Sequence, residues 1–255
     1  MNEKTTQSKT ETDKILFSGK LYKAHLYIES RYKDLQRERE QNSFHPCITI
    51  SREAGAGVNS VCEHLLKYIE ENKIFPSQQW AAFDHNLIEE VLRHHHLPQR
   101  LAELMSEDRY SHIKSFIIEL LSKQPTKWSL VHKTSETILQ LAEVGNSIIV
   151  GRGGSIITAN LDNTLHIRLI ANLNDRIRRI QNILDVPRDK AENYIMKKDS
   201  DRNQYIKTYF NKDITDPHYY HLIINTSIVP NKTAGEMIGH LIEVYFKKYI
   251  TQPLK

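Results

Sequence analysis

Two glycines, Gly55 and Gly57, lie between a short apolar run and a helical pattern, which is where many α/β proteins bind phosphate groups. The apolar run Cys47–Ile50 is typical of a buried strand, and apolar residues at helical spacing follow Gly57. Glycine lets backbone amides approach phosphate oxygens without a Cβ in the way. The segment Ser51–Ser60 is therefore predicted to be a phosphate-binding loop, and a tight turn without a ligand is the alternative interpretation.

The predicted loop lacks the lysine that commonly accompanies such loops. The pattern G-x-x-x-x-G-K-S/T would place glycine at position 52 and lysine at position 58, whereas this sequence has Arg52 and Val58. The hydroxyl of Ser60 is a candidate ligand for a nucleotide-bound Mg²⁺. The predicted phosphate-binding residues are Ser51, Gly55, Ala56, Gly57, Val58, Asn59 and Ser60.

Positive charge is concentrated in the segment from Arg176 to Lys212. It contains ten basic and five acidic residues, an excess of five in a chain whose net charge is only +4. Because the planar fork of arginine binds phosphate bidentately, the segment is predicted to be an anion-binding surface. Arg176 and Arg179 have an alternative role as the solvated face of a helix, with Asp175 and Arg179 paired four residues apart. The modest net charge does not by itself argue for nucleic acid, and no recognised nucleic-acid motif accompanies it.

Two more polar residues follow predicted strands. Asp84 comes after Trp80–Phe83, and Arg152 stands among glycines after Ser147–Val150. Ligands bind beyond the carboxyl ends of parallel strands, so both residues are candidate ligand contacts. Asp84 has an alternative role at the N-terminus of the next helix. His94–His96 do not predict a metal site, because consecutive helical residues point in different directions.

Strands and helices alternate along the chain, and this order must position the residues above. Parallel strands need helical crossovers, so the alternation predicts an α/β three-layer sandwich with a mostly parallel five-stranded sheet. It also predicts a helical insertion at 97–144. The predicted strands are Cys47–Ile50, Trp80–Phe83, Ser147–Val150, Thr164–Leu169 and His221–Asn225.

The composition is that of a soluble globular protein, with 255 residues, 39% hydrophobic and 26% charged. No apolar stretch approaches the roughly 20 residues that span a bilayer, and the polar N-terminus is unlike a signal peptide, so cytoplasmic residence is expected. Cys47 and Cys62 are expected to be buried, reduced thiols. We expect an arm at 1–45, with a disordered start and a charged helix that docks on the domain, a partner or a second copy, before a domain at 46–250.

Six sequence blocks resemble, in the same order, those of the cytidylate-kinase-like branch of the nucleoside monophosphate kinases. The block Ile48–Gly57 is similar to the Ile-Ser-Arg-Glu-Tyr-Gly-Ser-Gly-Gly opening of that family. The resemblance extends from about Cys47 to Phe246 and leaves the arm outside. The other blocks are Phe83–Asp84 with the helix that follows, Ile148–Gly154, Leu173–Arg179, Lys197–Arg202 and Asp216–Thr226.

This resemblance implies a P-loop kinase type of fold with a helical lid at 185–215, and transfer of the ATP γ-phosphoryl group to a nucleoside monophosphate, with Mg²⁺ between the phosphates. Asp84 and Arg152 would then lie on the acceptor side. Arg176, Arg179 and Arg202 would close over the transferring phosphate, and Arg52 or a lid arginine would replace the missing lysine.

The sequence also departs from the family pattern at the loop. Family loops often carry Gly-Arg in place of Lys-Ser or Lys-Thr, and Val58 and Asn59 supply neither cation. His221 stands where an aspartate is usual. A second hypothesis is therefore a catalytically weak or inactive relative that acts as a nucleotide-binding regulatory or protein-interaction module.

Overall fold

The computed structural model describes residues 26–31 and 44–247, except for gaps at 76–78, 85, 89–91, 93–100, 103–104, 106 and 122–127. The predicted disordered start of the chain and His94–His96 lie outside the described residues. None of the described helices combines the length and the apolar character that a membrane crossing requires.

Five strands form one sheet in which every neighbouring pair is parallel. Their order across the sheet is β2-β3-β1-β4-β5. The predicted α/β fold with a five-stranded sheet is thus confirmed, and each strand lies within two residues of its predicted position. The strands are β1 (Cys47–Arg52), β2 (Ala81–Phe83), β3 (Ser147–Val150), β4 (Thr164–Ile170) and β5 (Leu222–Asn225).

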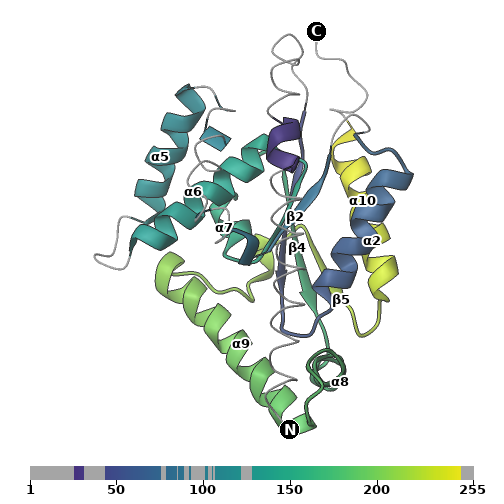
Figure 1. Cartoon of the computed structure of the whole chain (residues 1–255). Coiled ribbons are helices and arrows are strands. Elements are labelled where there is room, and N and C mark those ends of the chain that lie inside the picture. The colour runs from purple at the N-terminus through teal and green to yellow at the C-terminus, as the bar shows by residue number, and fades with distance from the viewer. Residues whose placement is uncertain are drawn as a thin grey trace, which may run out of the picture.

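Helices cover both faces of the sheet (Figure 1). On one face α2 (Val58–Glu71) and α10 (Asn231–Tyr245) pack together over the strands, and their apolar stripes share a core with β1 and β4. The other face carries α6 (Trp128–Val144) and α7 (Gly154–Ile157), with α5 (Glu107–Leu121) packed on α6. These helices cover the two faces of the sheet but not the edge formed by the carboxyl ends of the strands, which two later helices cover.

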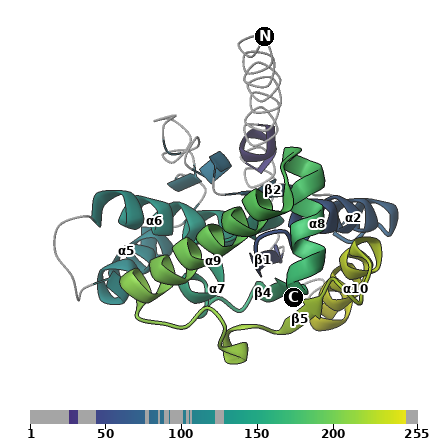
Figure 2. The same ribbon diagram turned by 90° about the horizontal axis from the view of Figure 1, so that it is seen from below.

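Two helices lie beyond the edge at which the strands end. After β4 the chain forms α8 (Leu173–Leu184) and then α9 (Arg188–Phe210), which crosses below the sheet (Figures 1 and 2). A short 3-10 helix, η1 (Pro217–Tyr219), leads into β5. Because α9 spans the carboxyl edge, its inner face is directed towards the predicted ligand site.

Residues 26–31 of the predicted arm form a helical turn that packs on the domain. Tyr27 and Ile28 are buried in the same core as Phe83, and the rings of Tyr27 and Phe83 meet edge to face at 5.3 Å. Arg31 donates a hydrogen bond to the carbonyl oxygen of Val144 at 3.2 Å. This part of the arm therefore contacts the domain, while the boundary after residue 45 stays a prediction.

One face of β4 is polar although the strand lies inside the sheet. His166 lies on that face, and its Nδ1 is 2.8 Å from the hydroxyl of Thr49. The backbone N–H of His166 donates to Nδ1 of His221 at 2.9 Å, and the backbone N–H of His221 donates to the carbonyl oxygen of His166 at 2.7 Å. The His221 ring therefore extends the β4–β5 ladder, and its Nδ1 must be unprotonated to accept this bond.

Stability is expected to fall in mild acid because of these two histidines. Burial, with a smaller effect of His221, lowers the pKa of His166 from 6.5 to about 4, and burial also lowers the pKa of His221. The unfolded chain then binds more protons than the folded chain below pH 6.5, so the free energy of unfolding should drop by about 2–3 kcal/mol between pH 6.5 and 4. Denaturant unfolding across this range measures the slope, and His166→Asn should flatten it. A slope unchanged in that variant would contradict the assignment.

Candidate functional site

A cavity of about 380 Å³ lies at the carboxyl ends of β1, β2 and β3, under the inner face of α9. Acidic and basic side chains both line this cavity, and α9 contributes Lys198 and Arg202. This is the position at which a parallel α/β sheet binds ligands. Of the residues predicted to form the site, those that line the cavity are Ser51, Arg52, Asn59, Asp84, Arg152 and Arg202.

Arg52 carries a positive charge that nearby acidic groups balance only in part. Its Nε is buried and, among the described residues, has no hydrogen-bond partner. Burial, together with the positive charges of Arg202 and Arg152, lowers the pKa of Arg52 to about 10, although the carboxylate of Asp84 acts in the opposite direction. A buried cation without full compensation is costly, so the cavity favours an anion beside this guanidinium.

Arg152 is held in the cavity by an unusual turn. Gly151, Arg152 and Gly153 all have positive φ, at 85°, 54° and 74°. A positive φ is unfavourable for arginine, and such strain is typical of functional turns. The guanidinium of Arg152 lies over the ring of Tyr205, 5.3 Å from its centroid. The turn also approaches Arg52 closely, because a Cβ on Gly151 would collide with Nη1 of Arg52.

Asp84 caps a helical turn and also lines the cavity, and its predicted contact with a ligand stays a prediction. Its Oδ1 accepts a hydrogen bond from the backbone N–H of Leu87 at 2.9 Å, which caps the helical turn after β2. The same residue lines the cavity beside Asn86. The cap fixes the carboxylate at the carboxyl end of β2.

β1 extends two residues beyond its predicted end. It continues through Arg52 and α2 begins at Val58, so the loop comprises residues 53–57, and the predicted phosphate-binding segment Ser51–Ser60 also includes the end of β1 and the first turn of α2. Gly57 caps α2 with φ 80° and no side chain caps the helix. The first backbone N–H groups of α2 therefore lack intrahelical partners and favour an anion.

The first turn of α2 directs one side chain to the cavity. Asn59 lines the cavity, whereas Ser60, the predicted Mg²⁺ ligand, does not. The amide oxygen of Asn59 is a ligand type that Mg²⁺ accepts. Within the described part of the chain, no three His, Cys, Asp or Glu side chains are grouped to hold a metal.

Arg179 binds the backbone of the loop instead of lining the cavity. Its Nη1 donates to the carbonyl oxygen of Gly55 at 3.2 Å and to the hydroxyl of Thr226 at 2.9 Å. Its Nη2 donates to the carbonyl oxygen of Thr226 at 2.6 Å. Arg179 thus ties the loop to the segment after β5, and it is not part of a solvated helix face.

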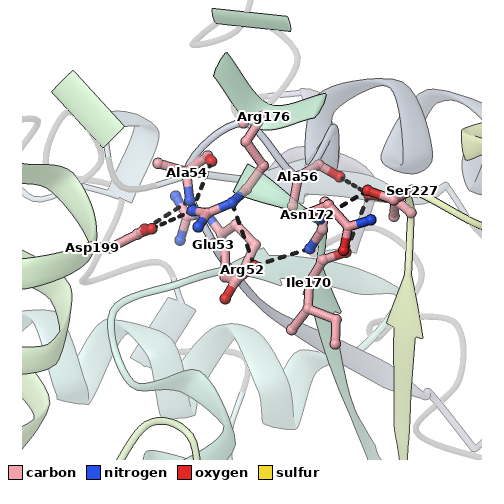
Figure 3. Close-up of polar contacts among 12 residues, drawn as sticks. Arg52, Glu53, Ala54, Ala56, Ile170, Asn172, Arg176, Asp199 and Ser227 are labelled. Atoms are coloured by element: carbon pink, nitrogen blue, oxygen red, sulfur yellow. Dashed lines mark hydrogen bonds and ion pairs between the residues drawn. The ribbon is translucent and has the colours of Figure 1, made fainter. Parts of the chain in front are cut away.

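Arg176 supports the loop from the same helix. Its side chain is only 11% exposed, and its Nε lies 3.6 Å from Oε2 of Glu53. Its Nη1 donates to the carbonyl oxygen of Ala54 at 3.4 Å and to Oδ2 of Asp199 at 2.5 Å (Figure 3). Both predicted arginines of α8 therefore face the loop, where their hydrogen bonds fix its backbone.

The sequence interpretation missed several residues of this region. Glu53 accepts a hydrogen bond from the backbone N–H of Ala171 at 2.9 Å, which joins the loop to the end of β4. Asp199 accepts one from the backbone N–H of Ala54 at 2.7 Å. Arg168 of β4 donates to the hydroxyl of Ser51 at 3.0 Å. Asp199 and Arg168 could have been found in the sequence, because each is a charged residue at a position where the pattern of its helix or strand expects an apolar one.

A family model and one solved structure agree with this architecture. A family model described as the cytidylate kinase-like family matches residues 47–228, well over half of the chain. No curated protein matches the sequence significantly. An uncharacterized protein of known structure from Eubacterium ventriosum is similar with 21% identity and a TM-score of 0.59, covering 78% of this chain and 99% of that chain. A structure from Thermus thermophilus has 10% identity and a TM-score of 0.43, covering 79% and 99%.

Proposed function

The chain belongs to the cytidylate kinase-like family, and from its site we propose that it is an enzyme that transfers the γ-phosphoryl group of ATP, bound with Mg²⁺, to a nucleoside monophosphate or a similar small acceptor. The observation that carries this proposal is the half-buried Arg52, whose positive charge lies near those of Arg202 and Arg152. Such a group fits the phosphate of an acceptor, because a bound anion would neutralise it.

The residues divide the work of phosphoryl transfer in this proposal. The free N–H groups at the start of α2 hold phosphates of the donor, and Arg52 and Arg152 hold the phosphate of the acceptor. Arg202 neutralises charge on the group in transfer, since it lines the same cavity and its Nη1 is 3.4 Å from the carbonyl oxygen of Arg52. Mg²⁺ would neutralise further charge on the donor phosphates, with Asn59 of the cavity wall as a candidate ligand. Catalysis of this kind depends on positioning and charge stabilisation.

A nucleotide-binding module without activity is the second candidate function. Val58 and Asn59 leave the loop without its usual cation. The carboxylate of Asp199 also occupies a loop amide, that of Ala54, in the structure. A protein that binds ATP and transfers nothing would fit both observations.

An acceptor panel separates the two functions. We expect ADP production from ATP and Mg²⁺ with at least one nucleoside monophosphate, above the rate without acceptor. Binding of ATP without turnover of any acceptor would favour the inactive module. Failure to bind ATP at all would reject both functions.

A further inference from the structure

The inner face of α9 is apolar at both ends and polar in the middle. The polar residues are Asp199 and Arg202, which follow the same helical stripe as the apolar ones. The two ends pin α9 to separate cores, one shared with α8 and one with α5 and α6. The buried apolar residues of the stripe are Ala191, Ile195, Ile206 and Phe210.

The polar middle of this stripe contacts the loop after β1, at residues 53–57. Oδ1 of Asp199 accepts a hydrogen bond from the backbone N–H of Ala54 at 2.7 Å, and Oδ2 accepts one from Nη1 of Arg176 at 2.5 Å. Nη1 of Arg202 is 3.3 Å from Oδ1 (Figure 3 shows Asp199 against the loop). One loop amide and two guanidinium groups thus surround a single anionic group, which is the donor set that a phosphate would require.

We propose that the carboxylate of Asp199 stands in for a donor phosphate and latches α9 onto the loop until the polyphosphate of ATP displaces it. This inference rests on the proposed function, because it names the group with which ATP must compete.

The competition follows from charge and from the number of donors. The N–H of Ala54 can make one strong hydrogen bond, and two anions this close repel each other. ATP must therefore break the charge-assisted bonds of Asp199 before it gains its own, and this cost lowers its apparent affinity. Arg176 keeps Glu53 as a partner when Asp199 leaves. Arg202 becomes available to the incoming phosphate.

Asp199→Asn tests the latch, because asparagine keeps the shape and removes the charge. Calorimetric titration with ATP and with inorganic tripolyphosphate should show affinity about tenfold higher than in the unaltered protein, equivalent to about 1.4 kcal/mol. Asp201→Asn is the matched control, since Asp201 lines the cavity but has no described contact with the loop. Its affinity should change by less than about threefold, which allows for the loss of one nearby charge.

The possible outcomes separate this inference from the proposed function. If the unaltered protein binds ATP and Asp199→Asn does not bind it more tightly, the latch is wrong and the proposed function stands. Equal gains in ATP affinity in both variants would mean that the loss of any nearby negative charge explains the change, and this would also reject the latch. Absence of ATP binding in every protein, including Asp199→Asn, would overturn both.

A measurement on the unaltered protein does not depend on how the Asp199 and Asp201 variants fold. In protein labelled with 15N-alanine, saturating tripolyphosphate should shift the backbone resonance of Ala54, which Ala54→Gly identifies by its loss. The shift is expected because the partner of that N–H changes from carboxylate to phosphate. An unmoved Ala54 resonance would reject the displacement.

Discussion

Replacing Arg52 by methionine is expected to lower kcat/KM by about 10²–10³-fold and, at the same time, to raise the melting temperature by about 2–4 °C. The loss of activity follows from removing a cation that stabilises charge on the acceptor, a contact typically worth about 2.7–4 kcal/mol. The gain in stability follows because burial and the charges of Arg202 and Arg152 disfavour the folded, charged Arg52. Relief of about 1 kcal/mol would produce such a shift in a chain of this size.

A lower kcat/KM together with a higher melting temperature would distinguish a functional arginine from a structural one. Arg178→Met is the matched control, because Arg178 is 74% exposed and its described ion pair is with Asp175 on the surface of α8. It removes the same charge and should leave both activity and melting temperature nearly unchanged. A lower melting temperature in Arg52→Met, measured by calorimetry, would show that Arg52 holds the fold together and would weaken the proposed anion site.

The sheet could be predicted from the sequence because its strands are short apolar runs with glycine or polar residues at their ends. Buried parallel strands are apolar on both faces, so each run stands out without any knowledge of its partners. The order of strands across the sheet could not be predicted in this way, since it depends on where each crossover returns. The polar face of β4 was also missed, because Thr164, His166 and Arg168 alternate with apolar residues in a run interpreted only as a strand.

Three of the predicted residues that line the cavity lie at the ends of strands or just beyond them. Arg52, Asp84 and Arg152 reach the cavity because the carboxyl ends of parallel strands converge there. The arginines of α8 were harder to interpret. A helical pattern predicts on which face of the helix a residue lies, but not which part of the protein that face contacts. Arg176 and Arg179 contact loop carbonyl groups instead of lining the cavity. Their predicted catalytic role over the transferring phosphate stays a prediction.

Replacing Gly151 by alanine is expected to reduce kcat/KM by about a hundredfold without changing any charge. The added Cβ would collide with Nη1 of Arg52, so the guanidinium must move. A displacement of about 1 Å at a reacting group is enough for such a loss. The positive φ of 85° at Gly151 also disfavours alanine, which should cost about 1–2 kcal/mol of stability in thermal unfolding.

Gly153→Ala separates the collision from the backbone strain. Gly153 has φ 74° in the same turn, but its added Cβ would meet the ring of Phe210 at 3.0 Å and not Arg52. Both variants should therefore lose similar stability, and Gly151→Ala should lose more activity. Equal losses of activity in the two variants would show that strain in the turn, and not the position of Arg52, limits the reaction.

A double-mutant cycle then tests whether Gly151 acts through Arg52. If its only effect on catalysis is to place the guanidinium, Gly151→Ala should cost almost nothing further in a protein that already carries Arg52→Met. Methionine ends short of the guanidinium position, so the new methyl group meets no cation there. Losses that multiply in the double variant would mean that the turn contributes separately, for example by holding Arg152 over Tyr205.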